Sequence, residues 1–261
     1  MPISLFSPAR IQYLRVVILM VKRELKVKYR GTVLGYLWSM LNPLLFMLTI
    51  SFVFSHMMKG IPNYNLFVLA GILSWNLSSV AIVGGTHSIS NSGHLVRKIK
   101  MPIWVFPLVP LASGGVNFLL ALIPFVIVLY TSGNSLGLGV IALPVVFLLF
   151  SGFLLGAALG FSTLNVFFKD VGHVLEPVLQ LVFYATPIIY DRHNPSIPEY
   201  AARLINLNPF THYIEAMRSC LIYGEFPSLV EFLIMSVSTG VSLAIGFVIY
   251  KKAKKKIIFH V

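Results

Sequence analysis

The chain has 261 residues, of which 57% are hydrophobic and only 11% are charged, and its mean hydropathy is +0.86. Because soluble domains carry about a quarter charged residues, this composition excludes an ordinary soluble protein and indicates an integral membrane protein. The formal net charge of +12 could suggest a nucleic-acid partner. The basic residues form short separate clusters instead of a continuous stripe, however, so we expect no nucleic-acid binding.

The basic residues also divide unequally along the chain. Sixteen of the twenty lie in residues 10–30, 97–100, 169 and 251–256, and the other four are Lys59, Arg192, Arg203 and Arg218. Cytoplasmic segments of membrane proteins are enriched in Lys and Arg, so the first group is expected on the cytoplasmic side. Both termini are then cytoplasmic.

The first expected element is an amphipathic helix over about residues 11–30. Its apolar side holds Leu14, Val17, Ile18, Val21 and Leu25, and its basic side holds Arg15, Lys22, Lys26 and Arg30. The uninterrupted apolar run, residues 16–21, is far too short to cross a membrane. We therefore expect this helix to lie in the membrane surface, although a basic face that only sets topology is the alternative.

Charge-free runs then predict six membrane spans, at about residues 33–54, 65–86, 104–130, 139–168, 174–190 and 230–250. These ranges are 17 to 30 residues long, and a spanning helix needs roughly 20 apolar residues. Residues 101–168 carry no charge and would measure about 100 Å as one helix, so the chain must turn back near residues 131–135. We expect one all-α transmembrane domain over residues 1–261.

The expected cytoplasmic loop at residues 93–102 has mixed character. Its apolar residues Leu95 and Ile99 alternate with three cations, and Pro102 ends the segment. This pattern predicts a short helix with a face on which a separate motor protein could dock. An ordinary loop that only obeys the positive-inside rule is the alternative.

The expected outer segment at residues 191–227 predicts two short helices. Ser196 and Glu199 have the spacing of a capping box with Pro198 between them, and Asn208 with Pro209 begins the second helix, which Gly224 ends. Helices too short to span are tolerated in the outer leaflet only when they pack on protein or line a cavity. They could form an extracellular gate; an inert amphipathic loop is the alternative.

Several kinds of chemistry lack their signatures. The chain has no Gly-x4-Gly-Lys-Ser/Thr loop, so we expect no ATP hydrolysis and no enzyme activity of its own. It has no acidic cluster that could carry a magnesium-bound diphosphate, and its histidines show no metal-ligand spacing. We therefore expect neither a metal nor another cofactor in this chain. The single cysteine, Cys220, excludes an intramolecular disulfide.

Four segments together resemble a known family. They are RELKVKYRGTVLGYLW at residues 23–38 followed by Asn42 and Pro43, residues 95–102, NVFFKDV at residues 165–171, and LNPFTHYIEAMR at residues 207–218. In these the chain is similar to bacterial ABC-exporter permeases for polysaccharides, the family of O-antigen permeases of the Wzm type and of capsule and teichoic acid permeases. Lys169 stands where that family more often has arginine, which keeps the charge.

The resemblance implies a transport mechanism. Two copies of the permease would form a channel along their interface in the bacterial inner membrane, and two copies of a separate ATP-binding subunit, which hold the ATP and Mg²⁺, would dock below. The cargo would be a polysaccharide such as O-antigen on an undecaprenyl diphosphate lipid.

The resemblance also implies roles for particular residues. The coupling region that contacts the ATPase would include Leu95, Val96, Arg97, Lys98, Ile99 and Lys100, and the interface helix would present Arg23, Lys26, Tyr29 and Arg30. The periplasmic gate would include Asn208, Pro209, Phe210, Tyr213 and Arg218. Sugar rings stack on aromatic side chains, so Phe52, Phe54, Phe183, Tyr184 and Tyr190 are candidate channel residues, with core or lipid packing as the alternative for each.

Other functions stay open at this point. A permease for teichoic acid, capsule or a smaller lipid or drug would share the architecture. A membrane sugar-phosphate transferase and a non-transporting assembly scaffold are the alternatives from other classes, and the missing acidic cluster disfavours the transferase.

Overall fold

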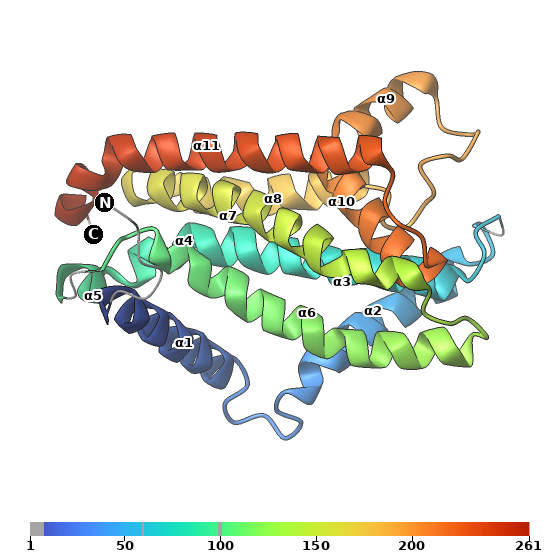
Figure 1. Cartoon of the computed structure of the whole chain (residues 1–261), viewed down its shortest axis with the longest axis horizontal. Coiled ribbons are helices and arrows are strands. Elements are labelled where there is room, and N and C mark those ends of the chain that lie inside the picture. The colour runs from blue at the N-terminus through green and yellow to red at the C-terminus, as the bar shows by residue number, and fades with distance from the viewer. Residues whose placement is uncertain (1–7, 59, 99–100, 261) are drawn as a thin grey trace.

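The computed structural model describes the backbone of residues 8–58, 60–98 and 101–260, and the side chains of residues 13–58, 60–96, 101–257 and 260. Every regular element within these ranges is a helix (Figure 1). In chain order they are α1 Pro8–Lys28, α2 Leu37–Phe54, α3 Tyr64–Ser79, η1 Val80–Gly84, α4 Gly85–Asn91, α5 Gly93–Lys98, α6 Val105–Thr131, η2 Leu138–Ala142, α7 Leu143–Phe167, α8 Asp170–Ala185, α9 Glu199–Leu207, α10 Pro209–Arg218, η3 Ser219–Tyr223 and α11 Leu229–His260.

Five helical segments of the described chain are long and apolar enough to cross a membrane. They are Leu37–Phe54, Tyr64–Asn91, Val105–Thr131, Leu138–Phe167 and Leu229–Ile257, and they correspond to the first four expected spans and the sixth. The second segment is continuous because the π-helical turn η1 joins α3 to α4. The expected all-helical membrane class is therefore confirmed.

The fifth expected span, residues 174–190, differs from the helix that forms there. Helix α8 has 16 residues, or about 24 Å, which is shorter than the roughly 30 Å hydrocarbon core. It begins early because Asp170 lies in its first turn, where a carboxylate favours the helix dipole. It ends early because Pro187 disfavours the helical conformation of the preceding residue, and Thr186 is extended with φ −101° and ψ 136°.

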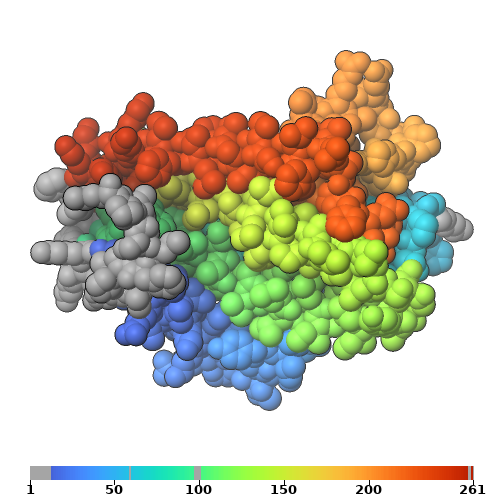
Figure 2. All heavy atoms as spheres, in the orientation of Figure 1, coloured from blue at the N-terminus to red at the C-terminus, as the bar shows by residue number. Residues whose placement is uncertain are grey.

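Helix α3 and its continuation α4 form the centre of the bundle. Thirteen of the sixteen residues of α3 are buried, and α4 packs between α6 and α7 (Figure 1). On one side of this centre α11 packs along α7, and Figure 2 shows the two helices side by side. The two helices approach closely because Gly246 has no side chain. A Cβ at this position would collide with the backbone of Gly156.

The two ends of the bundle differ in charge. Helix α5 and the last turns of α11, which carry the basic residues 251–256, lie at one end, and α1 runs from this end towards the middle of the bundle (Figure 1). Helices α9 and α10 lie at the opposite end, where α9 protrudes from the body of the molecule (Figure 2). The five lysines of residues 251–256 therefore lie at the end of the molecule away from α9 and α10.

Candidate functional site

Helix α10 begins at Asn208 and Pro209, as the sequence predicts. The Asn208 Oδ1 accepts a hydrogen bond from the backbone N–H of Phe210 at 3.1 Å, and Pro209 occupies the first turn. The Asn208 Nδ2 donates to Thr186 Oγ1 at 2.8 Å. One side chain therefore caps α10 and also ties it to the chain leaving α8.

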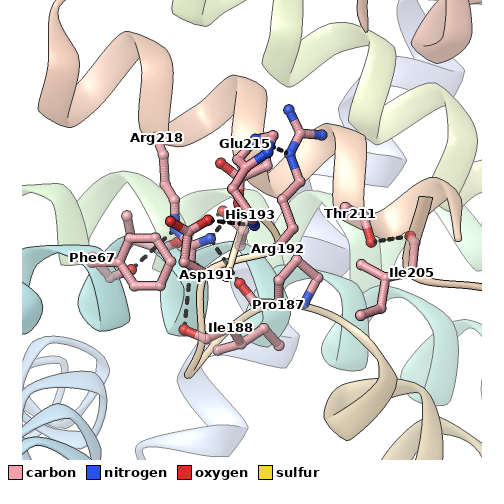
Figure 3. Close-up of polar contacts among 12 residues, drawn as sticks. Phe67, Pro187, Ile188, Asp191, Arg192, His193, Ile205, Thr211, Glu215 and Arg218 are labelled. Carbon is pink, nitrogen blue, oxygen red and sulfur yellow. Dashed lines mark hydrogen bonds and ion pairs between the residues drawn. The ribbon is translucent and has the colours of Figure 1, made fainter. Parts of the chain in front are cut away.

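Arg218, the last residue of α10, is fully buried. Its Nη1 donates to Glu215 Oε1 at 2.6 Å and to the Pro187 carbonyl at 2.7 Å, and its Nη2 donates to the Ile188 carbonyl at 3.0 Å (Figure 3). Its Nε donates to the Phe67 carbonyl at 3.2 Å. A buried charge is tolerated when its donors are satisfied, and all three nitrogens of this guanidinium are used.

The Arg218 contacts join three parts of the fold that are distant in sequence: α10, the first turn of α3, and residues 187–188. The centre of α3 is shaped for this side chain, because a Cβ at Gly71 would lie 2.9 Å from Arg218 Nη2 and 3.1 Å from Ile188. Sequence analysis counted Arg218 among the outer charges and as a gate residue. It did not predict that this residue would be enclosed, since the carbonyl partners carry no sequence signal.

The other two gate candidates on α10 point into the bundle. Phe210 lies between Trp75 and Phe153, with ring centroids at 5.6 and 5.3 Å. Tyr213 stacks on Phe150 at 4.7 Å and donates its hydroxyl hydrogen to the Met235 carbonyl at 2.9 Å. Eight of the ten residues of α10 are buried, so this helix is part of the packed protein and not an exposed loop.

The neighbouring short helix α9 is different. Only Ile205 of its residues is buried, while Tyr200, Leu204 and Leu207 are exposed. It begins at Glu199 without the expected capping box, because Pro198 is the cap residue and the backbone N–H of Ser196 instead bonds to Asn194 Oδ1 at 2.9 Å. Helix α9 therefore presents an apolar surface that α10 does not.

An ion pair at this end was not predicted from sequence. Arg192 Nη2 lies 2.8 Å from Glu231 Oε1, and the two side chains are 17% and 13% exposed. Figure 3 shows Arg192 beside Asp191 and His193 in the segment that leads from α8 to α9. The pair ties this segment to the start of α11.

The candidate channel aromatics do not form one set. Phe183 lies 6.4 Å from Phe46 and 5.5 Å from Trp75, centroid to centroid, and 5.2 Å from Tyr184. The Tyr190 hydroxyl donates to the Tyr184 carbonyl at 3.2 Å. Phe183, Tyr184 and Tyr190 are therefore brought together. Phe46 and Trp75, which were not among the sequence candidates, belong to the same group.

The other two aromatics lie apart from this group. Phe52 is 86% exposed on α2, and Phe54 is half-buried against the core. Phe52 has no aromatic neighbour within the described part of the chain. It is thus available to a lipid or a second copy of the chain.

The expected coupling segment is helical as far as the structure describes it. Leu95 and Val96 lie on α5 and pack against an apolar cluster of the same chain that includes Ile103, Phe106 and Ile257. Arg97 and Lys98 belong to α5, but their side chains lie outside the described set, and Ile99 and Lys100 lie outside the described residues altogether. The apolar face expected to be free for docking is therefore partly used within this chain.

Helix α1 and the two residues that follow it place their side chains on two different surfaces. Arg23, Lys26 and Arg30 are exposed, whereas Tyr29 donates its hydroxyl hydrogen to Asn117 Oδ1 of α6 at 3.1 Å. Leu14 and Ile18, expected on the apolar side, are exposed, so the face that meets α6 is instead centred on Glu24 and Leu25. The expected amphipathic face is thus only partly the face that packs.

Glu24 makes the main polar contact of α1 with the bundle. Its Oε1 accepts a hydrogen bond from Ser113 Oγ at 2.8 Å. Burial raises the pKa of the Glu24 carboxyl, while the Ser113 hydrogen bond and the nearby Lys28 act in the opposite direction. The Glu24–Lys28 ion pair that the (i, i+4) spacing favours is replaced by this contact between helices.

Comparison with known proteins identifies the family. The sequence model described as "ABC-2 type transporter" matches residues 15–222, which include the segments at residues 23–38 and 207–218. The chain belongs to the ABC-2 type transporter family. The resemblance predicted from these segments is confirmed.

Individual ABC-2 relatives are similar over most of the chain. The O-antigen export system permease protein RfbA of Klebsiella pneumoniae is 31% identical over 240 residues, which is 91% of this chain and 91% of that protein. The RfbA protein of Myxococcus xanthus is 33% identical over 218 residues, 83% of this chain and 84% of that protein. The polysialic acid transport protein KpsM of Escherichia coli is 22% identical over 241 residues, 88% of this chain and 90% of that protein.

Family membership settles the general class of the protein. It is a multi-pass membrane protein and the transport subunit of an ABC transporter, and ATP is hydrolysed by a partner subunit. The expectation of a transport subunit without its own ATPase is confirmed by the ABC-2 family.

Proposed function

We propose that this chain is the permease subunit of an exporter that moves lipid-linked O-antigen polysaccharide across the bacterial inner membrane. The observation that carries the proposal is the 31–33% identity to O-antigen export permeases of two organisms, over more than four-fifths of both chains. Similarity to the polysialic acid transport protein is lower, at 22%. O-antigen is therefore favoured over capsular polysaccharide as the cargo.

The proposal includes an assembly of two permease chains and two ATP-binding subunits, with both termini and α5 in the cytoplasm. In this assembly α8, although shorter than the five long segments, is the fifth of six passes. Its support is the exposed polar stripe of α8, since His173, Glu176 and Gln180 follow one another at helical spacing and all three are exposed. Ionisable side chains at membrane depth face protein or water and not lipid, so this stripe favours a water-filled path along a second copy of the chain.

The aromatic group beside this stripe supports the same path. Phe46 of α2 and Tyr184 of α8 are both exposed and meet around Phe183. Sugar rings present apolar faces that pack on aromatic rings. We place the glycan between α2 and α8 of the two copies, with α10 as the gate at the periplasmic end and α5 as the contact with the ATPase.

The carried lipid would be undecaprenyl diphosphate, and the test is to identify what the purified complex retains. Permease and partner ATPase are extracted from the native membrane, and bound lipids are identified by mass spectrometry. We expect a polyprenyl diphosphate bearing O-antigen sugars. Retention of only a small lipid or drug-like molecule would favour the alternative exporter, and a capsular glycan would move the assignment to capsule export.

A further inference from the structure

A polar cavity of about 240 Å³ lies where the end of α1 meets α2, α3 and α6. Three carboxamides reach it from three different helices: Asn42 of α2, Asn76 of α3 and Asn117 of α6. Lys28, the last residue of α1, lines the same cavity. An asparagine side chain in a spanning helix costs free energy unless its amide is hydrogen-bonded. Three of them at one cavity therefore indicate a polar ligand.

Two of the three carboxamides are free to bind something. Asn117 Oδ1 accepts the hydrogen bond from Tyr29. Asn42 and Asn76 are both exposed to the cavity, and neither side chain has a hydrogen-bond partner among the side chains and backbone that the structure describes. Together they offer four N–H donors and two carbonyl acceptors.

The charge at the cavity is positive. Within the described residues the Lys28 ammonium makes no ion pair, because the nearest acid of α1, Glu24, is bonded to Ser113 instead. Arg30 is exposed two residues further on. An anion beside Lys28 would therefore meet cations and amide donors, and the nearby carboxylate of Glu24 is already bonded to Ser113.

The rest of the lining is apolar. Trp38, Leu73, Leu77 and Phe118 form the walls beyond the polar groups. The site thus has the two-part character of an amphiphile: donors and a cation on one side, hydrocarbon and aromatic surface on the other. It lies at the end of the basic helix α1, level with Asn76 and Asn117 near the middle of the spanning segments Tyr64–Asn91 and Val105–Thr131.

We propose that this cavity binds the phosphorylated head of a lipid, with the phosphate beside Lys28 and the Asn42 and Asn76 carboxamides bonded to phosphate or sugar oxygens. The apolar walls hold the first carbons of the lipid chain. The inference rests on the proposed function in one respect, because an exporter of lipid-linked glycan supplies such a head group as cargo. A bilayer phospholipid supplies the same chemistry.

The test compares two lipid probes on the full-length permease purified with its ATPase in lauryldimethylamine oxide, a detergent without phosphate or sugar. The probes are undecaprenyl diphosphate bearing one N-acetylglucosamine, and phosphatidylglycerol, titrated by native mass spectrometry. The variants are Lys28→Gln and the double change Asn42→Leu with Asn76→Leu. The matched control is Asn134→Leu, at a partly exposed position between α6 and α7, outside the cavity.

The double variant should weaken binding of the diphosphate probe at least tenfold, Lys28→Gln should weaken it less, and Asn134→Leu should leave it unchanged. Variant-sensitive binding of phosphatidylglycerol alone would assign the cavity to bilayer lipid. If wild type does not bind the diphosphate probe at all, the proposed function fails whether or not phosphatidylglycerol occupies the cavity. A third outcome is that wild type binds both probes, and that the double variant binds them equally well and unfolds at the wild-type temperature. That result overturns the cavity proposal, while the proposed function stands.

Discussion

The guanidinium of Arg218 lies 3.4 Å from the centroid of the Phe67 ring, and the same side chain donates a hydrogen bond to the Phe67 carbonyl at 3.2 Å. Arg218 therefore binds the central helix α3 through both the backbone carbonyl and the ring of Phe67. Cation–π attraction is strongest where the cation is desolvated, as Arg218 is. Helix α10 is thus anchored at its end by Arg218 and at its start by Asn208.

This anchor predicts a large effect on stability. Replacing Arg218→Met would leave the Glu215 carboxylate and several buried carbonyl groups without a partner, so we expect a loss of about 3–5 kcal/mol. The Arg218→Lys variant keeps the positive charge but not the planar set of guanidinium donors, so its loss of stability should be smaller than that of Arg218→Met. The measurement is thermal unfolding of the detergent-solubilised protein. An Arg218→Met protein that unfolds at the wild-type temperature would show that the contacts contribute little.

Cysteine labelling tests the topology. Cys220 is fully buried, so the native protein should resist a maleimide reagent until it is unfolded. Cysteines introduced at position 134 and in residues 193–197 should then react with a membrane-impermeant reagent added from the periplasmic side, and one at position 254 should not. Labelling of position 254 from the periplasm would contradict the orientation proposed from the basic residues.

The polar stripe of α8 predicts a specific transport defect. Glu176→Leu with Gln180→Leu removes polar groups that would face the path, so we expect export to fall roughly tenfold, equivalent to ~1.4 kcal/mol on the barrier. The matched control is Leu181→Ala, an exposed apolar position of the same helix. Surface glycan per permease molecule is the readout, and equal losses in both variants would mean that α8 is only a packing element.

The buried carboxyl of Glu24 predicts a pH dependence. Its pKa is raised in the folded protein, so the charged form is disfavoured there and stability falls as the pH rises through the raised pKa. Glu24→Gln keeps an acceptor for Ser113 Oγ without the charge. We expect its unfolding temperature to exceed that of wild type at pH 8 and the difference to shrink as the pH falls towards 4. A difference that grows on acidification would reverse the assigned sign.

The spans and the family could be predicted because their signals are local. Charge-free runs mark long helices wherever they occur, and Asn208 followed by Pro209 marks a helix start from two adjacent residues. The early end of α8 was also marked, by Pro187, but the apolar run around it outweighed that signal. Local patterns therefore predicted most helices and misjudged one.

The contacts that organise the candidate site could not be predicted in the same way. Arg218 bonds to carbonyl groups 30 to 151 positions away in sequence, and any residue type offers such a carbonyl. The pairing of Glu24 with Ser113 likewise depends on how α1 rotates against α6. Leu14 and Ile18 share the apolar spacing of Leu25 yet face outward, since periodicity does not tell lipid from protein as the partner.

The most direct test of the proposed export function is translocation in inverted inner-membrane vesicles that contain the permease and its partner ATPase. Lipid-linked O-antigen is supplied on the outer face, and the glycan that becomes protected from an added glycosidase is measured with and without ATP. We predict ATP-dependent protection that requires both subunits. Hydrolysis of ATP by the assembled complex with no protected glycan would contradict the assignment of this chain as an O-antigen export permease.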